Sequence, residues 1–120
     1  MEQERRGLRF AFTAAAEIAP ASTPTALVPA RVTELSLQGC FLETSGSFEM
    51  QRPVVVKIYD SGEYFETKAS VLYVKPLGMG LVFLDIKPHF RAVLQKWILT
   101  ALDNQPGARP TPGSPNRTSA

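Results

Sequence analysis

The segment of residues 54–84 reads VVVKIYDSGEYFETKASVLYVKPLGMGLVFL. Apolar side chains recur in it at every second position, the period of a β-strand with one buried face. Two turn-forming clusters, Asp60-Ser61-Gly62 and Pro76-Leu77-Gly78, divide the stretch. The pattern predicts three consecutive strands joined by short turns. Its alternation places Phe65, Ala69, Val71 and Tyr73 on one face of the middle strand.

The same pattern extends toward the N-terminus. Residues 10–18 alternate in the same way, and further strands are predicted over residues 30–37 and 39–44. Residues 20–29 contain three prolines and no charged residue, so we expect a loop there. Six short strands at this spacing favour an antiparallel barrel or sandwich over a parallel sheet.

The hydrophobic period changes after Pro88, a residue suited to a first helical turn. The apolar residues that follow have the spacing of an amphipathic helix: Phe90, Val93, Leu94, Trp97, Ile98 and Ala101. This helix is expected to cover an open end or side of the sheet structure. Residues 103–120 are rich in Pro, Gly, Ser and Thr without an apolar cluster, so we expect a disordered tail.

Composition limits the class of protein. The 120 residues are 44% hydrophobic and 20% charged, which is typical of one globular domain. The net charge of +2 does not favour a broad nucleic-acid surface, and no apolar run is long enough to span a membrane. The single cysteine, Cys40, is expected to be a buried structural thiol. We expect a cytoplasmic, bacterial-type protein with no catalytic residues, no metal site and no cofactor.

Two separated motifs carry the candidate chemistry, Arg5-x-x-x-Arg9 and Glu34-x-Ser36-x-x-Gly39. An arginine fork matches the neighbouring N7 and O6 acceptors of guanine and also binds phosphodiesters. A carboxylate at Glu34 can accept hydrogen bonds from guanine N1–H and the N2 amino group, and Ser36 can donate or accept nearby. Together the two motifs indicate a site for a guanine nucleotide.

The position of the second motif on its strand leads to further expectations. Glu34 and Ser36 are two residues apart and should share the outer face, with Leu35 and Leu37 pointing into the core. Gly39 should permit a positive φ at the turn and a close approach of the backbone to a base. Either motif alone is more typical of a solvated basic terminus or of a polar strand face.

Taken in order, the two motifs resemble the signature of the PilZ domain family, RxxxR followed by (D/N)xSxxG. The resemblance covers roughly residues 4–102, and Glu34 departs from it by standing where the family has Asp or Asn. It implies binding of cyclic di-GMP through Arg5, Arg9, Glu34, Ser36 and Gly39.

The resemblance also implies a fold and a division of the chain. The expected fold is a six-stranded antiparallel β-barrel with a C-terminal helix. The expected parts are an N-terminal arm at 1–9, the barrel and helix at 10–102, and the tail at 103–120. Arg6 in the arm is a secondary candidate for a phosphate contact or a second ligand molecule, or is simply a solvated charge.

The expected function is a receptor that passes the cyclic di-GMP signal to a protein partner, with the arm folding onto the barrel when ligand binds. Two alternatives remain open. One is a PilZ module that interacts with proteins without ligand, for which Glu34 argues. The other is an RNA- or DNA-binding barrel, against which stand the low net charge and the lack of exposed aromatic residues interleaved with Lys and Arg.

Overall fold

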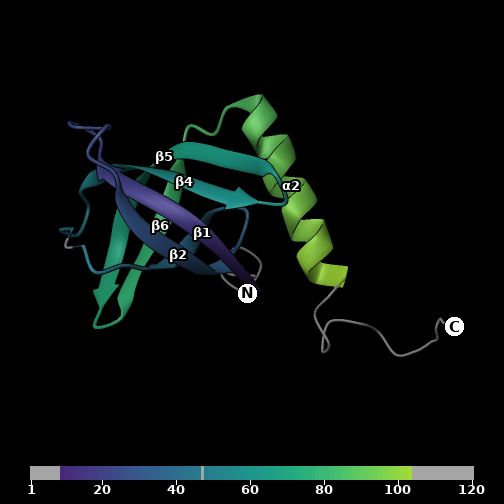
Figure 1. The fold of residues 1–120 in the computed structure, drawn as a ribbon, viewed down its shortest axis with the longest axis horizontal. Helices are drawn as coiled ribbons and strands as arrows, with labels where there is room; N and C mark the ends of the chain where they lie inside the picture. The colour runs from purple at the N-terminus through teal and green to yellow at the C-terminus, as the bar shows by residue number, and fades with distance from the viewer. Residues whose placement is uncertain (1–8, 47, 104–120) are drawn as a thin grey trace, which may run out of the picture.

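Six antiparallel strands close into a barrel, with one helix packed beside it, in the computed structural model, which describes residues 9–46 and 48–103 (Figure 1). The predicted barrel and C-terminal helix are confirmed. Arg5, Arg6 and most of the predicted tail lie outside the described residues.

The strands follow the chain with short connections. They are β1 (Phe10–Pro20), β2 (Val28–Leu35), β3 (Gly39–Glu43), β4 (Pro53–Asp60), β5 (Glu63–Lys75) and β6 (Gly78–Leu84). Around the barrel their order is β1-β2-β3-β6-β5-β4, and β4 pairs with β1 to close it. Closure leaves neither side of the sheet as a free edge.

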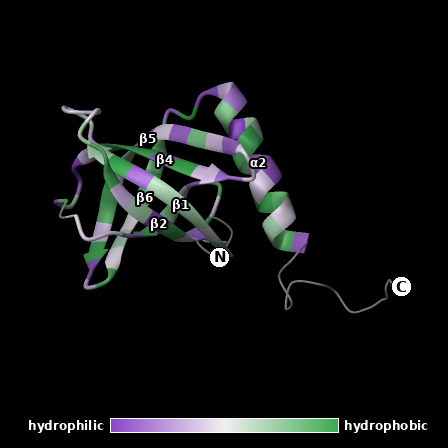
Figure 2. Ribbon diagram, viewed as in Figure 1, coloured by the Kyte–Doolittle hydropathy of each residue, from purple (hydrophilic) through white to green (hydrophobic). Residues whose placement is uncertain are grey.

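Alternating side chains build the core, as the sequence predicts. Val54, Val56 and Ile58 of β4 are fully buried, while Lys57 between them points outward and is partly exposed. Figure 2 shows the corresponding alternation of hydrophobic and hydrophilic residues along the strands. Burying each such side chain stabilises the fold by about 1.5–3 kcal/mol.

The helix α2 (Pro88–Asp103) buries its apolar stripe against β1 and β5. The ring of Trp97 stacks on Phe12 of β1 at 5.5 Å and lies 6.5 Å from Phe65 of β5. Through these aromatic contacts α2 covers the side of the barrel beside which it lies in Figure 1. No helix in the described ranges is long and apolar enough to cross a membrane.

The second strand begins and ends two residues earlier than predicted. β2 spans Val28–Leu35, so the loop after β1 is shorter than the predicted segment 20–29. After Leu35 the chain turns, because the backbone N–H of Ser36 bonds to the carbonyl of Gly39 at 2.9 Å. Leu35 is fully buried, but Leu37 at the turn is 45% exposed, so its predicted place in the core is wrong.

The face predicted for Tyr73 is also wrong. The pairing register of β5 with β6 shifts between Val71 and Tyr73, so that Val71 faces Leu81 and Tyr73 faces Gly80. A bulge of this kind adds one residue to a strand and redirects the side chains beyond it. Val71 therefore stays in the core, whereas Tyr73 emerges on the outer surface.

Candidate functional site

Strand pairing aligns one row of residues across the outer surface of five strands. Ala11 of β1 pairs with Glu34 of β2, and Glu34 pairs with Phe41 of β3. Phe41 pairs with Gly80 of β6, which pairs on its other side with Tyr73 of β5. The ring centroids of Phe41 and Tyr73 lie 6.3 Å apart. Residues distant in sequence thus form one continuous strip.

Arg9, just before β1, extends over this strip. Its Nη1 donates to Oε1 of Glu34 at 3.3 Å and to the phenolic oxygen of Tyr73 at 3.4 Å. The hydrogen bond to Tyr73 is the main cause that raises the pKa of Arg9, and Glu34 adds to the effect. Because the side chains of Arg9 and Glu34 are 48% and 47% exposed, their ion pair contributes little, about 0–1 kcal/mol.

Ser36 holds together the turn between β2 and β3. Its Oγ accepts from the backbone N–H of Gln38 at 3.2 Å and of Gly39 at 3.1 Å, and donates to the Gly39 carbonyl at 3.2 Å. These bonds use the one donor and both acceptors of a hydroxyl. Ser36 is buried and lies beyond the end of β2, so the prediction that it shares an exposed strand face with Glu34 is wrong.

Gly39 serves a different purpose from the predicted one. Among the described glycines only Gly62 has a positive φ, so the predicted positive φ at Gly39 is wrong. A Cβ on Gly39 would collide with the carbonyl oxygen of Leu81 in β6. The missing side chain at Gly39 instead lets the backbones of β3 and β6 approach each other closely, where Gly39 pairs with Val82.

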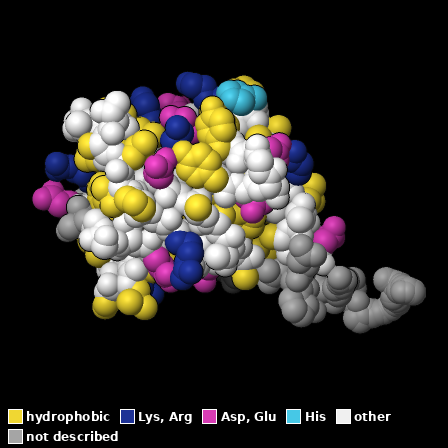
Figure 3. Space-filling view, viewed as in Figure 1, with side chains coloured by type: hydrophobic (Ala, Val, Ile, Leu, Met, Phe, Trp, Pro, Cys, Tyr) yellow, Lys and Arg dark blue, Asp and Glu magenta, His cyan; other side chains and the backbone are white. Residues whose placement is uncertain are grey.

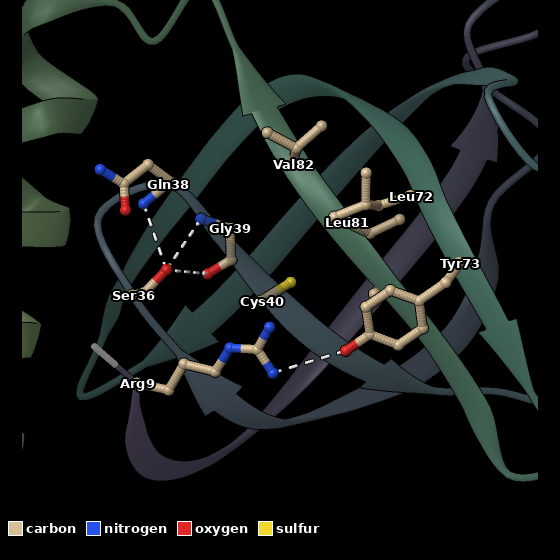
Figure 4. Close-up of a pocket in the computed structure, with 10 residues that line it drawn as sticks. Arg9, Ser36, Gln38, Gly39, Cys40, Leu72, Tyr73, Leu81 and Val82 are labelled. Carbon is tan, nitrogen blue, oxygen red and sulfur yellow. Dashed lines mark hydrogen bonds between the residues drawn. The ribbon is translucent and has the colours of Figure 1, made fainter. Parts of the chain in front are cut away.

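A pocket of about 130 Å³ opens where these features meet (Figure 4). The side chain of Arg9 reaches across it, and the Ser36–Gly39 turn forms one side. The structure thus brings Arg9, Ser36 and Gly39 together, and Glu34 reaches the site through its contact with Arg9. The other residues that line the pocket were not predicted for the site from the sequence: Gln38, Cys40, Leu72, Tyr73, Gly80, Leu81 and Val82.

Tyr73 is the polar contact that the sequence reasoning missed. Nothing in the alternation of β5 reveals the bulge, so the sequence pattern places Tyr73 on the inner face. The nearby Gly78-x-Gly80 pattern was the available sign. Glycine inside a strand often marks a bulge or a close approach, and a Cβ on Gly80 would collide with the ring of Tyr73.

Cys40, which lines the pocket, carries the one thiol of the chain. Cys40 is buried, and burial raises the pKa of its thiol to about 12, so the nucleophilic thiolate is strongly disfavoured. Within residues 9–46 and 48–103, no group of His, Cys, Asp and Glu is placed to hold a metal ion. On the face shown in Figure 3, cationic and anionic side chains are interspersed.

Replacing Ser36 with alanine should lower the free energy of unfolding by about 1–3 kcal/mol, because two backbone N–H groups lose their acceptor in a buried turn. Urea denaturation measures this change. Ser61→Ala is the control, since the Ser61 hydroxyl is exposed and, within the described part of the chain, bonds to Asp60 alone. Equal stability of the two variants would show that the Ser36 hydrogen bonds do not hold the turn.

Comparison with known proteins agrees with the fold and the motifs. The family model described as "PilZ domain" matches residues 3–100. The chain therefore belongs to the PilZ domain family. Among proteins with curated descriptions, none matches this sequence.

Solved structures of PilZ domains share the fold at low sequence identity. The PilZ domain of CeSA from a cellulose-synthesizing bacterium has a TM-score of 0.63 at 14% identity, covering 78% of this chain and 97% of its own. The PilZ domain of Escherichia coli YcgR, solved with c-di-GMP, has a TM-score of 0.65 at 13% identity, with coverages of 78% and 88%. Bacillus subtilis MotI, an inhibitor of motility, has a TM-score of 0.63 at 19% identity; the match covers 82% of this chain but 51% of MotI.

Proposed function

We propose that this chain is a bacterial, cytoplasmic cyclic di-GMP receptor that transmits the signal to a protein partner and has no catalytic activity. The proposal is supported chiefly by one observation: residues of both signature motifs lie at one site. Arg9, from the first motif, lies over the pocket that Ser36 and Gly39 line, and it contacts Glu34. YcgR, a structural relative, was solved with the same ligand.

Each side chain has a role that suits its chemistry. Arg9, together with Arg5 from the arm, supplies guanidinium groups for the guanine N7 and O6 atoms or for the phosphates. The carboxylate of Glu34 accepts from guanine N1–H and N2. Ser36 and Gly39 keep the turn close to the ligand; since the Ser36 hydroxyl is already fully used, its effect would come mainly through the backbone it fixes.

The size of the pocket suggests how the arm takes part. Pockets that enclose a drug-sized ligand have volumes of about 300–1,000 Å³, and this one measures about 130 Å³. It can hold only part of a cyclic dinucleotide, and the rest would lie on the outer surface of the barrel. Arg5 is close enough in sequence to Arg9 to reach that exposed part. Closing the arm over the ligand would create a new surface for the partner.

A second candidate function is a PilZ interaction module that has lost ligand binding. The favouring observation is that Glu34, longer than the Asp or Asn of the family signature, already pairs with Arg9. In a receptor, the ligand must separate this pair or fit around it. In a module without ligand, the pair would simply neutralise the charge of Arg9.

The sign of the effect of Glu34→Ala distinguishes the two candidates. In a receptor whose Glu34 contacts guanine, the variant loses a charged acceptor worth about 1.5–3 kcal/mol, so the dissociation constant rises roughly tenfold or more. Glu34→Asp should bind at least as well as the parent. Fluorescence titration with labelled cyclic di-GMP measures all three proteins. Tighter binding by Glu34→Ala would mean that this position opposes the ligand, and it would favour the interaction module.

A further inference from the structure

The β5 bulge gives Tyr73 a place on the outer surface that core packing does not require. Its ring lies directly over Gly80, in space that a Cβ would fill. The ring of Phe41 flanks it with an interplanar angle of 28°, and Nζ of Lys75 lies 5.4 Å from the ring centroid. These contacts fix the ring at the edge of the pocket, and Figure 4 shows its hydroxyl directed toward Arg9.

The hydroxyl of Tyr73 and the carboxylate of Glu34 contact the same nitrogen of Arg9. Both bonds use Nη1, at 3.4 and 3.3 Å. Among the described residues, the side chain of Arg9 makes no other hydrogen bond, so none of them occupies its Nε and Nη2 edge. That edge presents two parallel N–H groups, the geometry used in bidentate recognition of phosphates and carboxylates.

The two partners differ in how they affect an anionic ligand. The carboxylate of Glu34 cancels part of the charge that Arg9 would offer to a phosphate. The neutral phenol of Tyr73 holds the guanidinium without cancelling its charge. A side chain that is already held in its binding orientation loses less rotamer entropy when ligand binds.

We propose that Tyr73 is a positioning residue for the nucleotide site. Its hydroxyl holds Nη1 of Arg9 so that the Nε and Nη2 edge of the guanidinium faces the pocket. This inference rests on the proposed function and deepens it, because it assigns a role to a residue outside both signature motifs. The bulge in β5 and the missing side chain at Gly80 are what bring Tyr73 within reach of Arg9.

Tyr73→Phe tests the role by removing only the hydroxyl. Cyclic di-GMP should bind about three- to tenfold more weakly, the range expected for loss of one hydrogen bond. Tyr64→Phe is the matched control, because Tyr64 is an exposed tyrosine of the same strand outside the pocket. Circular dichroism should be unchanged for both variants. Equal affinity of Tyr73→Phe and the parent would overturn the proposal.

A double-mutant cycle separates positioning from a general structural effect. If Tyr73 acts through Arg9, adding Tyr73→Phe to Arg9→Ala should cause no further change in the dissociation constant. The same loss in both backgrounds would overturn the positioning role. Gly80→Ala offers a second route, because its Cβ must displace the Tyr73 ring, and it should reproduce the weaker binding.

NMR spectroscopy of the free protein tests the positioning role without any ligand. In the parent, the Nη1–H resonance of Arg9 should be shifted from that of a free arginine, and Tyr73→Phe should move it toward the free position. An unchanged resonance would overturn the positioning role whatever the ligand. Failure of the parent protein to bind cyclic di-GMP would instead overturn the proposed function, and the two failures can be told apart.

Discussion

Gly39→Ala is expected to destabilise the barrel strongly, by about 3 kcal/mol, the upper end of the usual range for overpacking. The reason is that a Cβ at this position meets the carbonyl oxygen of Leu81, a backbone atom of the neighbouring strand. Backbone in a paired strand cannot rotate away as a side chain can. Relief requires β3 and β6 to separate where Gly39 pairs with Val82, which weakens the closure of the barrel.

Thermal unfolding measures this effect, and the melting temperature should fall by more than roughly 10 °C. Gly80→Ala is the matched comparison in the same sheet. The atoms nearest to its Cβ belong to the ring of Tyr73, a side chain that can move, so the loss of stability should be clearly smaller. Similar melting temperatures for Gly39→Ala and the parent would contradict the close packing of these two strands.

The second large effect is expected on ligand binding. Arg5→Ala or Arg9→Ala should each remove charge-assisted hydrogen bonds to the ligand, worth about 1.5–3 kcal/mol. Affinity for cyclic di-GMP should therefore fall roughly 10- to 100-fold. Stability should change little for Arg9→Ala, because the side chain is half exposed and its ion pair with Glu34 is weak.

Arg31→Ala is the charge-matched control for these variants. Arg31 also lies on the barrel surface and also pairs with a glutamate, Glu43, at 3.0 Å, but it does not line the pocket. Losing one positive charge there should change affinity by less than the loss of Arg9. If Arg5→Ala and Arg9→Ala bound cyclic di-GMP as tightly as the parent and Arg31→Ala do, the arginine motif would have no part in recognition.

Strand alternation and helix periodicity predicted most of the fold because they report burial directly. The face of β4 that carries Val54, Val56 and Ile58 and the helix stripe around Trp97 are buried as expected. Both patterns depend only on neighbours within one element. The Pro-Leu-Gly turn before β6 was likewise predictable from its residues.

The errors arose where pairing between strands overrides the local pattern. The β5 bulge moves Tyr73 from the core face to the pocket, and the Ser36 turn ends β2 early and exposes Leu37. Gly39 was assigned to a turn conformation, whereas the approach of β6 sets its requirement. None of these features can be read from one strand alone. Of the candidate site, the sequence supplied the signature residues and missed Tyr73.

Isothermal titration of the parent protein with cyclic di-GMP measures whether this chain is a receptor. We expect saturable binding that is weakened in Arg9→Ala, with a stoichiometry that shows whether one ligand molecule or a stacked pair binds. A titration with no binding up to millimolar ligand, in protein shown to be folded, would contradict the receptor and leave the ligand-independent interaction module.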